Sequence, residues 1–93
     1  MARAAKDKKF CEAMLSEAIN ALLAGDVDLG KAMLRDYINA AVTFDVLSES
    51  MDKNPKSLMR MLSPKGNPTS RSLFMIFNSI QKLKKVHFRV AVY

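Results

Sequence analysis

The sequence predicts a mainly α-helical fold of five helices, followed by one C-terminal β-strand. Apolar residues recur every three or four positions over most of the chain, which is the period of an amphipathic helix. Valine and phenylalanine instead occupy every second position from Val86 to Val92, which is the period of a strand. With 93 residues the chain is long enough for a single domain, residues 1–93, with one modest core.

An N-terminal helix is expected within residues 1–24, beginning near residue 5. Its apolar stripe, with members three or four positions apart, comprises Phe10, Ala13, Met14, Ala18, Ala21 and Leu22. Gly25 follows where a helix needs a left-handed terminating residue. Asp28 is expected to cap a second helix that runs to about Ala41.

Capping signals predict the third and fourth helices. Thr43 is expected to cap a short helix over residues 44–51 through its hydroxyl group. The fourth helix opens with Asn54 as its cap and Pro55 at its first position, where a backbone N–H would have had no helical partner. It runs for about two turns and ends near Ser63.

The fifth helix is predicted from a repeat of the same start signal. Asn67 and Pro68 open it, and the apolar period continues through residues 68–84. The apolar side chains that this helix is expected to bury are Leu73, Ile76, Phe77, Ile80 and Leu83.

The terminal strand, residues 86–93, needs a partner for its backbone, because the chain contains no second strand candidate. Pairing with the same strand of a second copy would satisfy these groups and place a two-fold axis at the C-terminus. The predicted dimer interface comprises Val86, His87, Phe88, Arg89, Val90, Ala91 and Val92.

Charge is divided unevenly along a chain whose net charge is +6. Residues 1–52 hold six Lys or Arg and all nine Asp or Glu, a net charge of −3. Residues 53–93 hold nine Lys or Arg and no acid, a net charge of +9. An ordinary solvated surface mixes both signs. The half of the chain that carries only positive charges therefore indicates an anionic partner. The candidates, in order of preference, are nucleic acid, an anionic membrane and an acidic protein.

Several classes of protein do not fit the chain. No segment approaches the ~20 apolar residues that span a bilayer, and acids interrupt the basic N-terminal residues, unlike a signal peptide. A membrane-surface peptide exposes its aromatic residues, whereas Phe74, Phe77 and Phe88 fall at or beside expected core positions. The single cysteine, Cys11, excludes an internal disulfide and fits a reducing cytoplasm.

We expect neither catalysis nor a cofactor. The basic half has no paired carboxylates, and the chain has no glycine-rich phosphate loop. Its one histidine, His87, lies on the predicted strand without a second His, Cys or acid nearby in the sequence. It therefore supports neither a Ser-His-Asp arrangement nor a metal site.

Residues 43–63 have the spacing of a helix-turn-helix: a short helix, a tight turn at residues 51–54 and a second short helix. In that motif the second helix enters the major groove of DNA. Ser48 is small where the helices cross, and Leu58 and Leu62 face inward. The outward side chains are Lys56, Ser57 and Arg60. Such helix pairs also occur in many bundles and exposed charges are often only solvated, so the acid-free half is what favours DNA.

The polar side chains near the fourth helix have candidate roles. Arg60 suits a bidentate contact with guanine O6 and N7, and Lys56 suits a less directional contact with a base. Ser57 can donate a hydrogen bond to a base or to a phosphate. Flanking cations suit phosphates, which add affinity without sequence information. The candidate DNA-binding residues are Thr43, Lys53, Asn54, Pro55, Lys56, Ser57, Arg60, Lys65 and Arg71.

Residues 20–92 resemble a known family. The stretches that carry the resemblance are "PKSLMRML" in the fourth helix, "SPKGNP" after it and the closing alternating strand. They resemble the bacterial addiction-module antidote proteins, which are HigA-like, lambda-repressor-type helix-turn-helix antitoxins encoded beside a RelE/ParE-like toxin. The resemblance implies a dimeric repressor that binds its own promoter, and a partner toxin, usually an RNA-cleaving one, that it neutralises.

The resemblance also implies roles by position. Pro55, Lys56, Ser57 and Arg60 match the exposed recognition-helix positions, and Thr43 and Phe44 match the start of the first helix of the motif. Two positions depart from the family's pattern. Asp52 stands where the turn usually carries glycine, and Ser48 where alanine is usual. Aspartate tolerates a left-handed conformation, but its carboxylate near the phosphates would weaken binding modestly.

The leading interpretation is a cytoplasmic DNA-binding antitoxin that dimerises through residues 86–92 and represses its own operon at a palindromic operator. The alternative is a protein-interaction module that captures the toxin with weak or no DNA binding. In that alternative, the acidic first half would meet a basic ribonuclease.

Overall fold

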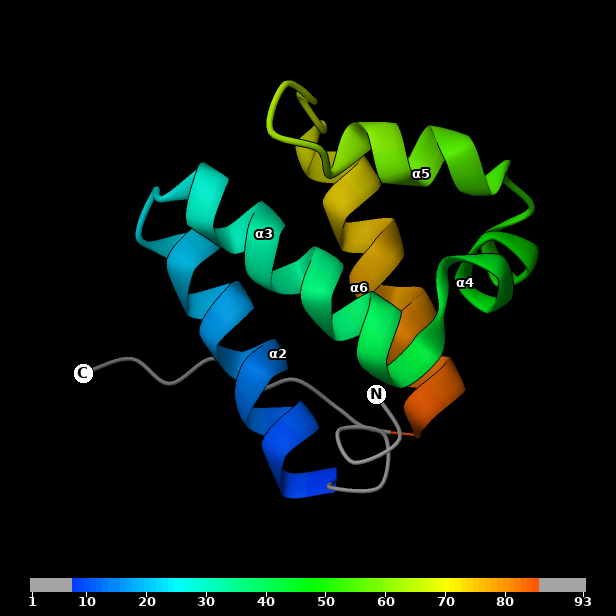
Figure 1. The fold of residues 1–93 in the computed structure, drawn as a ribbon, viewed down its shortest axis with the longest axis horizontal. Helices are drawn as coiled ribbons and strands as arrows, with labels where there is room; N and C mark the ends of the chain where they lie inside the picture. The colour runs from blue at the N-terminus through cyan, green and yellow to red at the C-terminus, as the bar shows by residue number, and fades with distance from the viewer. Residues whose placement is uncertain (1–7, 86–93) are drawn as a thin grey trace.

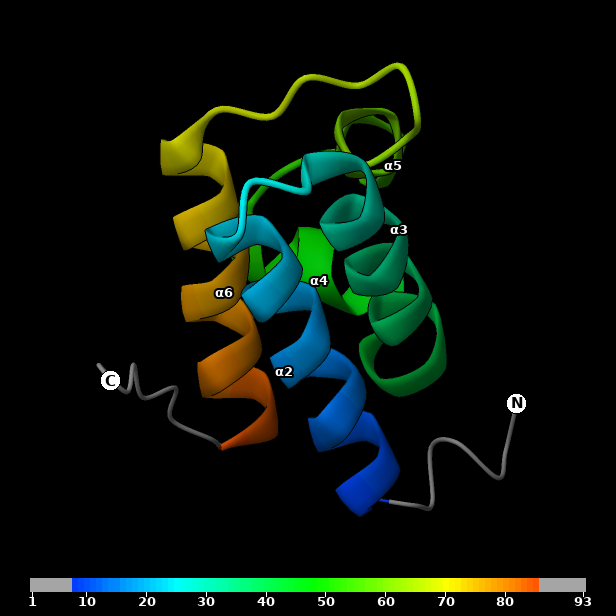
Figure 2. The ribbon, with the colours of Figure 1, turned by 90° about the vertical axis from the view of Figure 1, so that its left-hand side faces the viewer.

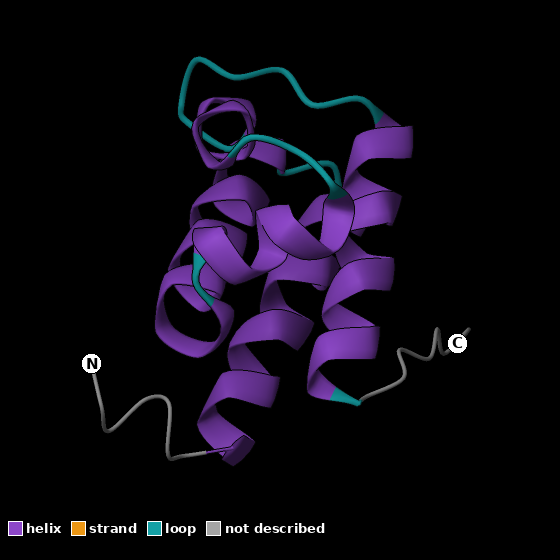
Figure 3. Ribbon diagram, turned by 90° about the vertical axis from the view of Figure 1, so that its right-hand side faces the viewer, coloured by secondary structure: helices purple, strands orange, loops and turns teal. Residues whose placement is uncertain are grey.

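The computed structural model describes residues 8–85, which form a mainly helical domain. Its elements are α2 (Lys8–Leu23), α3 (Val27–Tyr37), the π-helical turn η1 (Ile38–Val42), α4 (Phe44–Met51), α5 (Pro55–Met61) and α6 (Ser70–Lys84). In Figure 2, α2, α3 and α6 run roughly from top to bottom of the view, and in both Figures 1 and 2 α5 lies at the top end. Figure 3 shows the long loop that joins α5 to α6 at that same end. The predicted mainly helical class is confirmed, whereas the predicted strand at 86–93 lies outside the described residues.

One apolar core joins all of these elements. Its buried members are Cys11, Leu15, Ala18, Leu34, Tyr37, Ile38, Val42, Phe44, Leu47, Leu58, Leu62, Ile76, Phe77 and Ile80. Burial raises the pKa of Tyr37 to about 12, and electrostatic interactions with the neighbouring Cys11 and Glu12 act in the same direction. The tyrosine is therefore neutral over the whole physiological range.

The face that α2 buries overlaps the predicted stripe only in part. Ala18 is buried as predicted, whereas Phe10 is 52% exposed and Ala13 is exposed. Cys11 and Leu15 are buried in their place, so the buried stripe is rotated from the predicted one by less than one residue, where one residue corresponds to about 100°. Packing against α3, which is the main partner of α2, selects the stripe that contains Cys11.

The second helix begins and ends differently from the prediction. Asp26, not Asp28, caps α3, because its side-chain oxygen accepts a hydrogen bond from the amide of Leu29 at 3.3 Å. The helix also stops being regular before Ala41. From Ile38 the chain follows the wider π-helical turn η1, and the amide of Thr43 donates to the carbonyl of Ile38 at 2.6 Å.

The third helix is confirmed, with its predicted cap. The Thr43 hydroxyl accepts from the amide of Val46 at 3.3 Å, although φ of 79° and ψ of 147° are unusual for a β-branched residue. Asp52 ends α4 in the left-handed conformation, with φ of 54° and ψ of 48°. The prediction that an aspartate would adopt the turn conformation usual for glycine is therefore confirmed.

The last helix begins two residues later than predicted. Thr69 is its cap, accepting from the amide of Ser72 at 3.1 Å, and Ser70 is its first residue. Ile76, Phe77 and Ile80 are buried as expected. Leu73 is half-buried, whereas Leu83 is 36% exposed and Phe74 is 69% exposed, so the expectations that Leu83 is buried and that Phe74 lies by the core are wrong.

Candidate functional site

The short helix α5 is defined by signals in its own sequence. The side-chain oxygen of Asn54 accepts from the amide of Lys56 at 2.8 Å, and Pro55 occupies the first helical position. Leu58 and Leu62 are completely buried, so they fix which face of the helix points outward. All of these features follow the sequence prediction.

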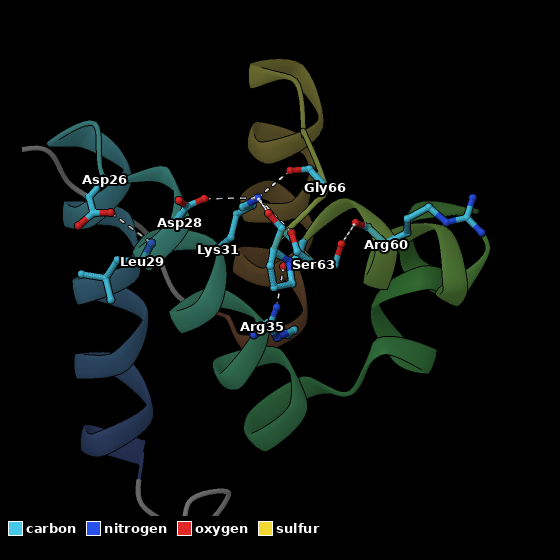
Figure 4. A network of polar contacts seen from close by, with 10 residues as sticks. Asp26, Asp28, Leu29, Lys31, Arg35, Arg60, Ser63 and Gly66 are labelled. Carbon is cyan, nitrogen blue, oxygen red and sulfur yellow. Dashed lines mark hydrogen bonds and ion pairs between the residues drawn. The ribbon is translucent and has the colours of Figure 1, made fainter.

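Three polar side chains occupy the outward face of α5. Lys56, Ser57 and Arg60 are all exposed, as predicted. Figure 4 shows the Arg60 side chain pointing away from Lys31 and Ser63. Met59 is 45% exposed beside them, so the face is cationic with one apolar member.

The loop after α5, residues 62–69, adds a third cation, Lys65, beside this face. It folds back along the end of α5 and closes a shallow groove of about 400 Å³, the α5 groove. The lining residues are Ser57, Arg60, Met61, Lys65, Gly66 and Asn67. The groove therefore contains two cations, one hydroxyl and one amide, and its lining includes no acid.

Gly66 is required by this close approach. A Cβ atom at that position would meet the backbone carbonyl oxygens of Arg60 and Met61. The carbonyl of Arg60 also accepts from Ser63, through both the amide at 3.2 Å and the hydroxyl at 2.7 Å. The loop and the carboxyl end of α5 thus form one packed unit.

Two cationic side chains of α3 donate hydrogen bonds to the backbone of this unit (Figure 4). Lys31, only 3% exposed, donates to the carbonyl oxygens of Ser63, Pro64 and Gly66 at 3.0, 3.3 and 2.6 Å. Arg35 donates to the carbonyl of Leu62 at 2.9 Å. Carbonyls at the end of a helix lack helical partners, and cations are favourable there.

Sequence reasoning missed Lys31. The sequence pattern that could have identified it is a lysine on an otherwise apolar helical face, because positions 31, 34 and 38 have the period of a buried stripe. Leu34 and Ile38, the other two members of this stripe, are completely buried. A lysine there needs several acceptors, because a charged group is costly to bury unless it is hydrogen-bonded.

The other predicted site residues lie outside the α5 groove. Thr43, Lys53 and Asn54 are exposed and Pro55 is half-buried, all at the ends of α4 and α5. Arg71 is exposed in the first turn of α6 and does not line the groove. The predicted dimer residues 86–92 lie outside the described part of the chain.

A second groove, of about 390 Å³, lies between α2 and α6 and is mainly apolar. Its lining residues are Ile19, Leu22, Leu23, Ser70, Leu73, Phe74, Phe77, Asn78 and Gln81. Among them, Leu23 is 66% exposed and Phe74 is 69% exposed. The groove exists because α2 packs chiefly on α3 and barely contacts α6. We call it the α2–α6 groove.

Neither a metal-binding cluster nor a membrane-spanning helix is found in residues 8–85. No group of three or more His, Cys, Asp or Glu there is arranged to hold a metal ion. None of the helices described in that range is long and apolar enough to cross a bilayer. Comparison with known proteins found no matching family model, no matching curated protein and no matching solved structure.

Proposed function

We propose that this protein is a sequence-specific DNA-binding regulator in which α4, the turn and α5 act as a helix-turn-helix. One observation carries the proposal: the outward face of α5 and the loop behind it bring Ser57, Arg60 and Lys65 to one open groove. These residues lie within 41 residues that contain no acid, so no neighbouring carboxylate in sequence neutralises them. A cationic, exposed helix of this size suits the major groove.

The proposed contacts divide into two kinds. Arg60 contacts guanine O6 and N7, and Lys56 and Ser57 contact other base edges, because these side chains project from the exposed face of α5. The cations of the flanking segments bind phosphates, which adds affinity without discrimination between sequences. These are Lys53, Lys65 and Arg71, and the exposed polar residues Thr43 and Asn54 are further candidate contacts.

Two features of the α4–α5 pair support the motif. Asp52 supplies the left-handed residue that ends α4 and lets the chain turn. Ser48 is buried, and its hydroxyl donates to the carbonyl of Asp45 at 2.9 Å, so this small residue needs no further partner where the helices pack.

We further propose that the protein is a lambda-repressor-type antitoxin of the cytoplasm, a dimer through residues 86–92 with a RelE/ParE-like toxin as its partner. The support is the sequence resemblance over residues 20–92. Gel filtration with light scattering tests the dimer. A persistent monomer at micromolar concentration would contradict pairing of the terminal strands.

A mobility-shift assay on the upstream DNA of the protein's own gene, at two salt concentrations, tests DNA binding. The affinity should fall steeply with salt, because each neutralised phosphate releases counterions. Arg60→Ala should relax sequence preference, with a loss of about 1–3 kcal/mol on the preferred site only. Lys65→Ala should weaken binding to all sequences alike and reduce the salt slope by about one.

Two controls sharpen this assay. Lys9→Ala changes a cation that is exposed on α2, away from α5, and should leave binding unchanged. Random duplex of equal length measures the sequence-independent part of the affinity. Equal affinity for the upstream DNA and the random duplex would overturn the repressor proposal.

The second candidate function is capture of a protein partner, and the α2–α6 groove favours it. The exposed side chains of Leu23 and Phe74 accompany an apolar cavity, a combination typical of interaction surfaces. A Leu23→Ser, Phe74→Ser variant should lose binding to the toxin encoded beside the gene while keeping DNA binding. Arg60→Ala should keep toxin binding and weaken binding to the preferred DNA site only. Toxin binding that survives the double substitution would exclude the groove as the toxin-binding surface.

A further inference from the structure

The backbone on both sides of Lys65 is held by a side chain from a distant helix. Lys31 of α3 donates to the carbonyl of Pro64 before it and of Gly66 after it, at 3.3 and 2.6 Å. The same ammonium group bonds the carbonyl of Ser63 at 3.0 Å. The Lys65 side chain itself is exposed and lines the α5 groove.

We infer that Lys31 and Arg35 are positioning residues that preform the α5 groove, an inference that rests on the proposed function. Lys31 has three donor hydrogens and three carbonyl acceptors, so its bonding capacity is filled by the loop alone. Arg35 extends the contact to the carbonyl of Leu62, the C-terminal cap of α5. Neither side chain touches the ligand; both act through the loop.

The advantage of this arrangement is lower conformational entropy loss on binding. A free loop would have to be ordered at the moment that Lys65 meets a phosphate, and this ordering would subtract from affinity. With its carbonyls already bonded and Gly66 packed on the end of α5, the loop holds Lys65 beside Arg60 before DNA arrives. Lys31 should therefore affect DNA binding only through Lys65 and its neighbours.

The nearby carboxylate of Asp28 is not part of the positioning contact. Its oxygen lies 3.9 Å from the Lys31 ammonium, and its side chain is 91% exposed. A solvent-screened pair at this distance contributes little. Asp28→Asn is therefore a matched control, which removes a charge beside Lys31 and leaves the three carbonyl bonds in place.

A double-mutant cycle between Lys31 and Lys65 tests the inference. Lys31→Met keeps a side chain of similar length and removes its donors. On the upstream DNA, Lys31→Met and Lys65→Met should each lower the affinity by about the same factor and the salt slope by about one. In the Lys31→Met background, Lys65→Met should have no further effect. If the effects of the two substitutions on DNA affinity multiply independently, the inference is overturned. Independent effects are what a purely structural role of Lys31 predicts, because such a role does not depend on Lys65.

A second measurement needs no DNA. The amide of Gly66 donates to the carbonyl of Ser63 at 2.9 Å, so its hydrogen exchange reports closure of the loop. Lys31→Met should accelerate exchange at Gly66 and leave Ile76 in α6 protected, and Asp28→Asn should change neither. Unchanged exchange at Gly66 in Lys31→Met would overturn the inference. If wild-type protein fails to prefer its own DNA, the proposed function fails and this measurement still decides whether the loop is held.

If circular dichroism shows that Lys31→Met does not fold, Arg35→Met provides the same test. It removes one bond, to the carbonyl of Leu62, and leaves Lys31 in place. The same cycle with Lys65→Met should again show a combined effect smaller than the product of the two single effects. Independent effects together with unchanged exchange at Gly66 would count against positioning by α3.

Discussion

At the end of α5, hydrogen bonds hold the loop that follows an exposed cationic face, whereas along the α2–α6 side apolar side chains line a groove that no described residue fills. At the α5 end, four loop carbonyls are bonded by Lys31 and Arg35. On the other side, Leu23 and Phe74 are mostly exposed. The first region is therefore held in place by hydrogen bonds within the fold. In the second region, the described residues leave these two apolar side chains uncovered.

The largest expected difference concerns two leucines, one in α5 and one in α6. Leu58→Ala in α5 removes a completely buried side chain and should lower the free energy of unfolding by about 2–5 kcal/mol. Leu83→Ala in α6, at 36% exposure, should cost less than about 1.5 kcal/mol. Urea denaturation followed by circular dichroism measures both. Equal losses would mean that α6 buries Leu83 in solution, and the comparison would fail.

Alanine substitutions at two glycines should distinguish the stability cost of a steric clash from the stability cost of backbone strain. Gly66→Ala places a Cβ against the carbonyls of Arg60 and Met61 and should cost about 1–3 kcal/mol. Gly25→Ala has open space, but its φ of 89° strains an alanine by about 1 kcal/mol. Thermal unfolding measures both costs. DNA binding should fall only for Gly66→Ala, and a loss in both variants would argue against the loop as a distinct binding element.

Thr43 offers a sharper test of how much strain the α4–α5 end contains. Its hydroxyl caps α4, but its positive φ is costly for threonine, by about 1–3 kcal/mol. Thr43→Ala should lose the cap, keep the strain and cost about 1 kcal/mol. Thr43→Gly should relieve the strain and be at least as stable as wild type.

Chemical denaturation of the two Thr43 variants decides the point. An unstrained cap predicts that both substitutions destabilise the protein, with glycine costing a few tenths of a kcal/mol. Thr43→Gly falling below wild type by a few tenths of a kcal/mol or more would therefore remove strain from the account.

The smallest effect is expected at Asp52, beside the cationic face. Asp52→Asn keeps a residue that tolerates the left-handed conformation and removes a negative charge from the carboxyl end of α4. Stability should rise by about 0.3–1 kcal/mol, and DNA affinity should rise modestly at low salt. High salt should cancel the gain in affinity, and a gain that persists there would have another cause.

Local signals predicted the α5 end of the fold well because each depends on residues a few positions apart. Thr43 and Asn54 cap α4 and α5 as expected. The two wrong caps, Asp28 for Asp26 and Asn67 for Thr69, each lie two residues from the true one. Several capping residues cluster at both places, and packing elsewhere in the fold decides which of them begins the helix.

Long-range contacts explain what the sequence did not predict. The bonds from Lys31 and Arg35 to the loop join residues 27 to 35 positions apart, and no short pattern announces them. The outward direction of Arg60 was predictable from the buried period of Leu58 and Leu62, whereas its sharing a groove with Lys65 was not. Similarly, α2 has two apolar stripes, and only its packing on α3 distinguishes them.

The π-helical turn η1 makes this fold sensitive to changes in chain length. It lies between Arg35, which precedes it, and the loop carbonyls, which follow. Removing one residue from Ile38–Val42 would return the chain to a regular helical repeat and rotate everything downstream by about 100° relative to α3. Each helix would survive, but the α3 cations would no longer face their acceptors. We therefore expect homologous chains to tolerate substitutions in this stretch far better than insertions or deletions of a single residue.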